Sequence, residues 1–209
     1  VYAASSSAYG GSTGDGLVLA LAAVAAKSPY AAAKLAGELY CQAFAHTYGL
    51  ETVRLRFFNI FGPRQRSDSP YSGVIALFTA AMSRGEVPTI HGDGTQSRDF
   101  TYVANAVQAL MKAAEAPDAS GNVYNVGTGR TVSVRELVTA LNSALEKDLQ
   151  PTYGAPRAGD VKFSRADISR TRRDLGYEPN VSFEEGLRLT VSAHLERSPA
   201  PAVAARSAR

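Results

Sequence analysis

Residues 28–49 read SPYAAAKLAGELYCQAFAHTYG and carry the clearest helix signal in the chain. Ser28 is a preferred N-cap residue, and Pro29 suits the first helical position. Gly49 suits the residue that ends a helix. The sequence therefore predicts a helix over Pro29–Tyr48.

Strands are expected on both sides of this helix, and strands and helices alternate along the chain. The strand-like stretches lie at 1–5, 52–58, 88–92 and 122–126. Further helices are predicted at about 73–84, 103–116, 131–147, 165–179 and 182–197. Ser182 and Glu185 have the spacing of a capping box. The alternation predicts an α/β fold with a parallel sheet, and the excess of helix in the second half predicts a smaller lobe on one side.

The composition is that of an ordinary globular protein, with 45% hydrophobic and 20% charged residues. The net charge of +3 is small and the Lys and Arg residues are scattered, which argues against nucleic-acid binding. Cys41 is the only cysteine. No disulfide can form within the chain, so we expect a reducing, cytoplasmic location and a buried, unreactive thiol.

The longest apolar run is LVLALAAVAA at 17–26. It falls well short of the roughly 20 residues that a membrane helix needs. We therefore expect a short core or interface helix there and no membrane association. Residues 198–209 are rich in Pro and Ala and are predicted to form a disordered tail.

Tyr30 and Lys34 lie four residues apart near the start of the predicted helix, so they share one helix face. A nearby ammonium stabilises a phenolate, which suits Tyr30 to act as a general acid/base. Alone, the pair is better explained as an ordinary helix surface. The serines at 5–7 end a predicted strand upstream, and the carboxyl ends of parallel strands line the ligand crevice. Hydroxyl, phenol and ammonium together predict an alcohol-oxidation site.

Six motifs occur in order: YAASSSAYG (2–10), SPYAAAK (28–34), RFFNIFGPRQ (56–65), GDGTQSRDFTYV (92–103), NVYNVGTG (122–129) and PRAGDVKFSRADISR (156–170). Over residues 1–195 the chain resembles the carboxy-terminal two-thirds of extended short-chain dehydrogenases/reductases. Within the NAD-dependent epimerase/dehydratase family, it is most similar to UDP-glucose and UDP-N-acetylglucosamine 4-epimerases.

The resemblance implies the carboxy-terminal part of a Rossmann-type parallel sheet, joined to a smaller mixed α/β substrate-binding lobe. On this resemblance we expect the amino-terminal cofactor-binding strands of the family to be absent from the chain. The implied division gives the Rossmann domain residues 1–65 and 100–130, and the lobe residues 66–99 and 131–197.

The resemblance also implies catalytic roles for three residues. Ser5 matches the catalytic hydroxyl, Tyr30 the catalytic base, and Lys34 the residue that also holds the nicotinamide ribose. Ser6 and Ser7 would lie beside Ser5 against the sugar. NAD+ would take a hydride from sugar C4 while Tyr30 takes the hydroxyl proton, and both would return to the other face of the 4-keto sugar.

A second group of residues is implied to bind the nucleotide part of a UDP-sugar. Arg98 and Arg157 match the two phosphate-binding arginines, which suit charge-assisted contacts to a pyrophosphate. Asn59 resembles a diphosphate contact, and Asp160 resembles the acid that binds the ribose.

The remaining implied positions concern the base, the sugar and the reaction type. Val74 and His91 correspond to the uracil pocket, although His91 is equally well explained as a turn residue. The family's dehydratases have an acidic residue within the segment that here reads Ser5–Ser7, so the hydroxyls favour plain epimerisation. Ser164 falls at the family's gate position and leaves room for N-acetyl sugars. No cluster with metal-ligand spacing is found.

The family's glycine-rich cofactor loop is not found in the sequence. GGSTGDG at 10–16 follows a strand, but its glycine spacing is one residue short, so we interpret it as a surface turn. We therefore expect an incomplete or split chain, with the strand at 1–5 an unpaired apolar edge. The isolated chain is expected to bind NAD weakly, to lack turnover and to aggregate or associate. A homodimer is expected only when the protein is complete.

Two other functions remain open from the sequence. The chain could belong to another extended epimerase or reductase that acts on a different nucleotide sugar. It could also be a non-catalytic remnant that binds a nucleotide sugar or a homologous partner. The intact Ser5, Tyr30 and Lys34 favour the 4-epimerase, whereas the missing cofactor loop favours the remnant.

Overall fold

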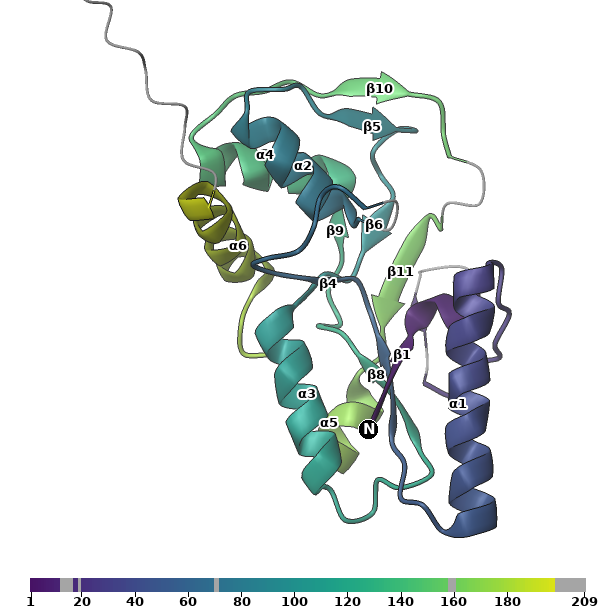
Figure 1. Ribbon diagram of the computed structural model, residues 1–209. Helices are drawn as coiled ribbons and strands as arrows, with labels where there is room; N and C mark the ends of the chain where they lie inside the picture. The colour runs from purple at the N-terminus through teal and green to yellow at the C-terminus, as the bar shows by residue number, and fades with distance from the viewer. Residues whose placement is uncertain (12–16, 19, 70–71, 158–160, 198–209) are drawn as a thin grey trace, which may run out of the picture.

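The computed structural model describes residues 1–11, 17–18, 20–69, 72–157 and 161–197. Figure 1 shows a lower part built around strands with helices beside them, and an upper part made mainly of helices. The predicted tail at 198–209 lies outside the described residues, as does most of the predicted surface turn at 10–16.

The main sheet has three parallel strands in the order β1-β3-β8. They are β1 (Tyr2–Ser5), β3 (Arg54–Phe57) and β8 (Val123–Val126). The register pairs Ser5 with Phe57 and Phe57 with Val126, so the three carboxyl ends lie level. The predicted α/β fold with a parallel sheet is confirmed. Among the described residues, β1 forms one edge of this sheet.

Three helices flank the main sheet (Figure 1). They are α1 (Pro29–Tyr48), α3 (Val103–Glu115) and α5 (Ser169–Leu175). The predicted ends of α1 are confirmed. The Ser28 side chain accepts a bond from the Ala31 N–H, and Gly49 ends the helix at φ 67°, a left-handed conformation that glycine adopts easily.

Strand β3 presents different chemistry to the two sides of the sheet, because successive side chains point to opposite faces. Arg56 points toward α1, where it binds Glu38. Leu55, the residue before it, is fully buried in an apolar cluster that includes Ala109 and Ala113 of α3. Strand β3 thus contacts α1 through an ion pair and α3 through apolar packing.

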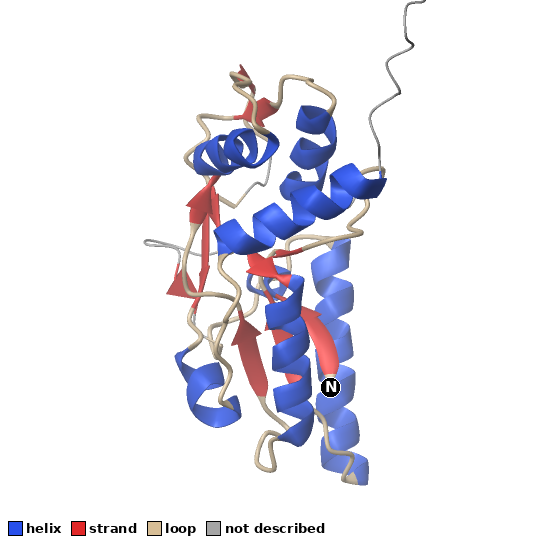
Figure 2. Cartoon of the chain, turned by 90° about the vertical axis from the view of Figure 1, so that its left-hand side faces the viewer, coloured by secondary structure: helices blue, strands red, loops and turns tan. Residues whose placement is uncertain are grey.

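The upper part consists of α2 (Val74–Ser83), α4 (Val134–Leu145), α6 (Phe183–Arg197) and the parallel pair β5 (Thr89–His91) and β10 (Thr152–Gly154). Figure 2 shows its helices stacked beyond the ends of the main strands. Their apolar faces form one core. Each helix contributes a fully buried side chain to it, for example Ile75 from α2, Leu137 from α4 and Leu187 from α6.

Short strands join the two parts. A four-stranded sheet has the order β2-β11-β6-β9, and a two-stranded pair joins β4 to β7. The bounds are β2 (Leu17–Val18), β4 (Ile60–Phe61), β6 (Ser97–Arg98), β7 (Thr101–Tyr102), β9 (Val132–Ser133) and β11 (Phe163–Ala166). A short 3-10 helix, η1 (Ser6–Tyr9), follows β1 directly.

The helix expected over residues 17–26 is wrong. Residues 17–18 form strand β2, and the described residues after it follow a bent path. Buried side chains contact carbonyl groups of this segment. Asn125 donates to Val18 O at 2.7 Å. Arg56 Nη1 donates to Ala20 O at 3.4 Å, and the Tyr9 hydroxyl, whose proton goes mainly to Asn125 Oδ1, lies 3.2 Å from the same carbonyl oxygen. These tertiary bonds use carbonyl groups that a helix would bond internally, so they override the helical preference of the apolar run.

The helix expected from Arg165 begins four residues later, at Ser169. Arg165 and Ala166 instead pair in β11 with Leu17 and Val18 of β2. The helix starts after a turn in which the Asp167 carboxylate accepts a bond from the Ser169 N–H.

The predicted capping box at the start of α6 forms only in half. The Ser182 hydroxyl accepts a bond from the Glu185 N–H at 3.1 Å, but the Glu185 carboxylate binds Arg188. A complete box, which the sequence analysis missed, lies at the start of α4, where Ser133 and Glu136 bond each other's backbone N–H groups.

Replacing this cap should measurably loosen α4. Ser133→Ala is expected to lower the free energy of unfolding by about 1 kcal/mol, because one N–H at the helix start loses its acceptor. Urea denaturation of the chain measures the change. Ser143→Ala, at an exposed position on the same helix, is the control and should change stability little. Equal losses for the two variants would contradict the capping role.

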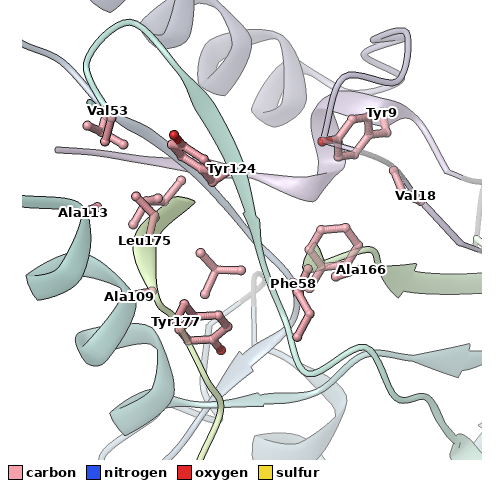
Figure 3. Packing of buried hydrophobic residues seen from close by; sticks show 14 residues of the cluster. Tyr9, Val18, Val53, Phe58, Ala109, Ala113, Tyr124, Ala166, Leu175 and Tyr177 are labelled. Carbon is pink, nitrogen blue, oxygen red and sulfur yellow. The ribbon is translucent and has the colours of Figure 1, made fainter. Parts of the chain in front are cut away.

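Each of the two parts has its own apolar core. Figure 3 shows side chains of the lower core, among them Tyr9, Phe58, Tyr124, Leu175 and Tyr177. The upper core contains the buried apolar side chains of α2, α4 and α6. The division predicted from the sequence stays a prediction. Leu175 and Tyr177, from the range predicted for the lobe, pack in the lower core.

Candidate active site

The three serines lie where β1 ends and turns into η1. Ser5 is the N-cap of η1, and its hydroxyl accepts bonds from the Ser7 N–H at 3.2 Å and from the Ser7 hydroxyl at 2.9 Å. All three serines are half-buried. A hydroxyl that accepts two bonds keeps its own proton free to donate, so Ser5 can offer a hydrogen bond to an oxygen at the carboxyl edge of the sheet.

Tyr30 and Lys34 occupy the first turns of α1, as the spacing predicts. The Tyr30 side chain is exposed, and the Lys34 Nζ lies 6.0 Å from the centroid of its ring. Lys34 is held from the other side by β1: its Nζ donates to Ala3 O at 2.9 Å and lies 5.6 Å from the centroid of the Tyr2 ring. The ammonium is thus fixed between the strand and the phenol.

These two groups of side chains come together through the topology. Strand β1 runs up to η1, and η1 packs against the first turns of α1 (Figure 1). The serine hydroxyls and the Tyr30–Lys34 pair therefore stand at the same edge of the main sheet. This edge faces the upper part of the molecule, so a ligand there can contact both parts.

A second group of predicted residues lines one cavity of about 250 Å³, whose wall comes from the upper part and the short strands that join it to the main sheet. The wall includes five residues proposed from the sequence, namely Asn59, Val74, His91, Arg98 and Arg157. They come from the end of β3, the start of α2, strands β5 and β6, and the loop after β10. Two guanidinium groups and an apolar wall in one cavity suit a ligand with an anionic part and a flat apolar part.

The backbone around Asn59 is unusual. Asn59 has φ 27°, a positive value that asparagine tolerates better than most residues. Its side-chain amide donates to Asp99 O at 3.3 Å, while its own carbonyl accepts from the Thr101 N–H at 3.2 Å. These bonds hold the chain where it leaves the main sheet and enters the cavity wall.

Arg98 is positioned by its own strand and the next one. Its Nη1 donates to Ser97 O at 2.9 Å and to Lys162 O at 3.5 Å. Ser164 is the register partner of Arg98 on the neighbouring strand β11, and it does not line the cavity. Arg157 is exposed at the cavity wall. Asp160 lies outside the described residues.

The sequence analysis missed several side chains of the cavity wall, among them Phe78, Gln96 and Phe100. Signals for them exist. Phe78 follows Val74 by four residues on α2 and so lies on the same helix face. Gln96 and Phe100 flank Arg98 within its motif, and Gln96 donates to His91 O at 2.7 Å.

The sequence analysis also missed Asp99, a fully buried carboxylate beside Arg98. It accepts bonds from the Thr128 N–H and hydroxyl at 2.8 Å each, the Gly129 N–H at 2.9 Å and the Ala166 N–H at 3.1 Å. Burial raises the pKa of the Asp99 carboxyl, and these bonds oppose the rise. Asp99 thereby ties the turn after β8 to the end of β11.

Two features are absent from the described residues. No helix in that part of the chain is both long and apolar enough to cross a membrane. No group of three or more His, Cys, Asp and Glu side chains is placed to hold a metal ion there.

The fold and the site define a class of protein. A parallel α/β sheet presents serine, tyrosine and lysine at its carboxyl edge and an arginine-lined cavity beside them, as in nucleotide-sugar enzymes of the short-chain dehydrogenase/reductase type. Residues 1–127 match the model of the NAD dependent epimerase/dehydratase family. The chain belongs to this family.

Three similar proteins illustrate the relationship. A UDP-glucose 4-epimerase of Mycolicibacterium smegmatis is 39% identical over 171 residues, which is 82% of this chain and 54% of that protein. The structure of a UDP-N-acetylglucosamine 4-epimerase from Methanobrevibacter ruminantium, in complex with UDP-N-acetylmuramic acid, is 40% identical with a TM-score of 0.88. A Bacillus cereus UDP-glucuronic acid 4-epimerase, in complex with UDP-glucuronic acid and NAD, is 30% identical with a TM-score of 0.85.

The lengths of these proteins differ from that of this chain. The alignment to the Methanobrevibacter ruminantium structure covers 94% of this chain but 62% of the longer one. For the Bacillus cereus structure the values are 93% and 60%. This chain thus spans a little more than half the length of its relatives.

Proposed function

We propose that this chain carries the catalytic and substrate-binding residues of an NAD-dependent nucleotide-sugar 4-epimerase. The observation that carries the proposal is one cavity in which Arg98 and Arg157 accompany an apolar wall. A UDP-sugar has the matching parts, because its pyrophosphate is anionic and its uracil is flat. Similar proteins that are named 4-epimerases of UDP-sugars support this choice.

In the proposed reaction the chain's own residues handle the proton. The Tyr30 phenolate takes the proton of the sugar 4-hydroxyl, while the Ser5 hydroxyl donates a hydrogen bond to the same oxygen. Lys34 stabilises the phenolate and holds the nicotinamide ribose. NAD+, when bound, accepts the C4 hydride and returns it. The C4–H and O–H bonds break as the C=O bond forms. The hydride would then return to the opposite face of C4, and Tyr30 would return the proton to the oxygen.

The remaining proposed contacts rest on the cavity for Asn59, Val74, His91, Arg98 and Arg157, and on the family resemblance alone for Ser6, Ser7, Asp160 and Ser164. Arg98, Arg157 and Asn59 bind the pyrophosphate, and Asp160 binds the ribose. Val74 and His91 pack on uracil. Ser6 and Ser7 face the sugar, and Ser164 leaves room for a 2-acetamido group, so UDP-glucose and UDP-N-acetylglucosamine are the substrates to test first.

The test of this function uses a chimera, defined as this chain fused to the segment of the Methanobrevibacter ruminantium epimerase that it does not match. With NAD+, the chimera should interconvert UDP-glucose with UDP-galactose or UDP-N-acetylglucosamine with its galacto epimer. UDP-glucuronic acid is the third substrate assayed. A folded chimera that converts none of the three would overturn the proposal. NADH accumulation with a released keto sugar would instead support a dehydrogenase.

The proposed role of Arg98 can be tested on the chain itself. Arg98→Ala is expected to weaken UDP binding by about tenfold or more, because a charge-assisted bond to phosphate is lost. Calorimetric titration with UDP measures the change. Arg173→Ala removes an exposed arginine on α5 and is the control. Equal affinity of the Arg98 variant and the unaltered chain would contradict the assignment. Binding without turnover in the chimera would favour the non-catalytic function.

A homodimer is part of the proposal. The outer face of α1 carries exposed apolar side chains, among them Leu39, Tyr40 and Tyr48. Light scattering of the chimera measures the oligomeric state, and a monomer at micromolar concentration would contradict this part of the proposal.

A further inference from the structure

A buried polar cluster lies one layer beneath the candidate catalytic edge, on the α1 side of the sheet. Its four members are Tyr9, Glu38, Arg56 and Asn125, and each is at most 5% exposed. They come from η1, α1, β3 and β8. Three of them lie within the motifs that carry the family resemblance, and Glu38 follows Lys34 by one helical turn. None of the four contacts the candidate ligand cavity.

Arg56 is the centre of this cluster. Its guanidinium binds both oxygens of Glu38, with Nε–Oε1 at 2.8 Å and Nη2–Oε2 at 2.7 Å. The same guanidinium lies 4.6 Å from the centroid of the Tyr9 ring. Burial lowers the pKa of Arg56, but the bonds to Glu38 and the contact with Tyr9 outweigh it and raise the pKa. The group stays charged and can hold both partners.

Tyr9 extends the cluster to the third strand. Its hydroxyl donates to Asn125 Oδ1 at 2.6 Å, and Asn125 is the register partner of Arg56 on β8. Burial raises the pKa of Tyr9, so the phenol keeps the proton that it donates. Tyr9 is the last residue of η1, whose first residues are Ser6 and Ser7.

The geometry of Arg56 therefore connects the two elements that carry the proposed catalytic groups. Glu38 lies on α1 two helical turns after Tyr30, on the face shared by Tyr30 and Lys34. Tyr9 fixes the end of η1, which begins directly after Ser5. Through one rigid planar group, the rotation of α1 and the position of η1 are set relative to each other.

We propose that Arg56 is a positioning residue, which holds the serine turn of η1 and the Tyr30–Lys34 pair of α1 in register for proton transfer. This inference rests on the proposed function. A buried ion pair contributes little net stability compared with well-packed apolar side chains, so stability alone does not require it. A small displacement of catalytic groups has a large effect on rate. An ion pair that holds these groups rigidly can therefore matter for the rate even though it adds little stability.

The test removes both charges together. In the double variant Glu38→Met, Arg56→Met, apolar side chains of similar length fill the space, so the fold should be kept. The exposed pair Arg84–Glu86, at the end of α2, is replaced in the same way as a control. In the chimera, the double variant should lower kcat by about tenfold or more and leave the KM for the UDP-sugar within about twofold, because the nucleotide cavity is untouched.

A second measurement needs no activity. Hydrogen exchange of the chain reports the Ser7 N–H, which bonds to Ser5, and the Gly10 N–H, which bonds to Ser7. In the double variant both should exchange at least about tenfold faster, while the amides of α4 should not change. If the double variant does not fold, Arg56→Lys serves instead, since it keeps the charge but lacks the planar fork.

The outcomes separate the two proposals. Unchanged exchange at Ser7 and Gly10 overturns the positioning role, as does a kcat within about twofold of the unaltered chimera. If the unaltered chimera has no activity, the proposed function fails, and the exchange experiment still decides whether Arg56 couples η1 to α1.

Discussion

Tyr30→Phe is expected to lower kcat of the chimera by about 10²- to 10⁴-fold, because the substitution removes the single group proposed to take and return the proton. The ring remains, so the packing of α1 should not change. The KM for the UDP-sugar should stay nearly constant, because Arg98 and Arg157 lie in a separate cavity beside the catalytic edge. Steady-state kinetics with each UDP-sugar measure both constants.

The control for this prediction is Tyr40→Phe, which removes the hydroxyl of an exposed tyrosine on the same helix. Its kinetic constants should match those of the unaltered chimera. If Tyr30→Phe retains most of the activity, Tyr30 is not the acid/base. A rise in KM without a fall in kcat would make Tyr30 a substrate contact.

Glu38→Gln should have the largest effect on stability, a loss of about 3–5 kcal/mol in the free energy of unfolding. The amide is nearly isosteric with the carboxylate, so the packing is kept while Arg56 loses its counter-ion. The Glu38 side chain is only 2% exposed, and water cannot replace it as a partner. Urea denaturation of the chain, followed by circular dichroism, measures the loss.

Glu86→Gln is the matched control, since Glu86 also binds an arginine at 2.7 Å but its side chain is 56% exposed. An exposed pair contributes little to stability because water screens it, so this variant should remain close to the unaltered chain. Similar small losses in both variants would show that the Arg56 charge is solvated. The Glu38–Arg56 pair would then not be a major contributor to the free energy of unfolding.

An element of the fold can be predicted from the sequence when the residues that determine it lie close to it in the sequence. Helix α1 is predicted to the residue, because Ser28, Pro29 and Gly49 mark its ends by local chemistry. Residues 17–26 are predicted wrongly, because their path is set by Asn125 and Tyr9, which are distant in sequence. The start of α5 is misplaced for a similar reason, since Ala166 pairs with Val18 in a sheet between the two parts.

The candidate site shows the same contrast. The Tyr30–Lys34 pair follows from helix periodicity alone. The cavity residues come from separate elements, so only the family resemblance brought Asn59, His91 and Arg98 together before the structure was known. Neither argument finds Arg56 as a connection between α1 and η1, since its partners Glu38 and Tyr9 are 18 and 47 residues away in the sequence.

Asp99 sets a mechanical limit on how a ligand can enter. Its carboxylate bonds the turn at Thr128 and Gly129 to Ala166, and its backbone N–H bonds to Ser164 O at 2.9 Å. A wide hinge opening between the lower and upper parts would break these bonds and expose the carboxylate without partners. We therefore expect the two parts to move as one body at this point, with entry to the cavity controlled by side chains and loops at its rim.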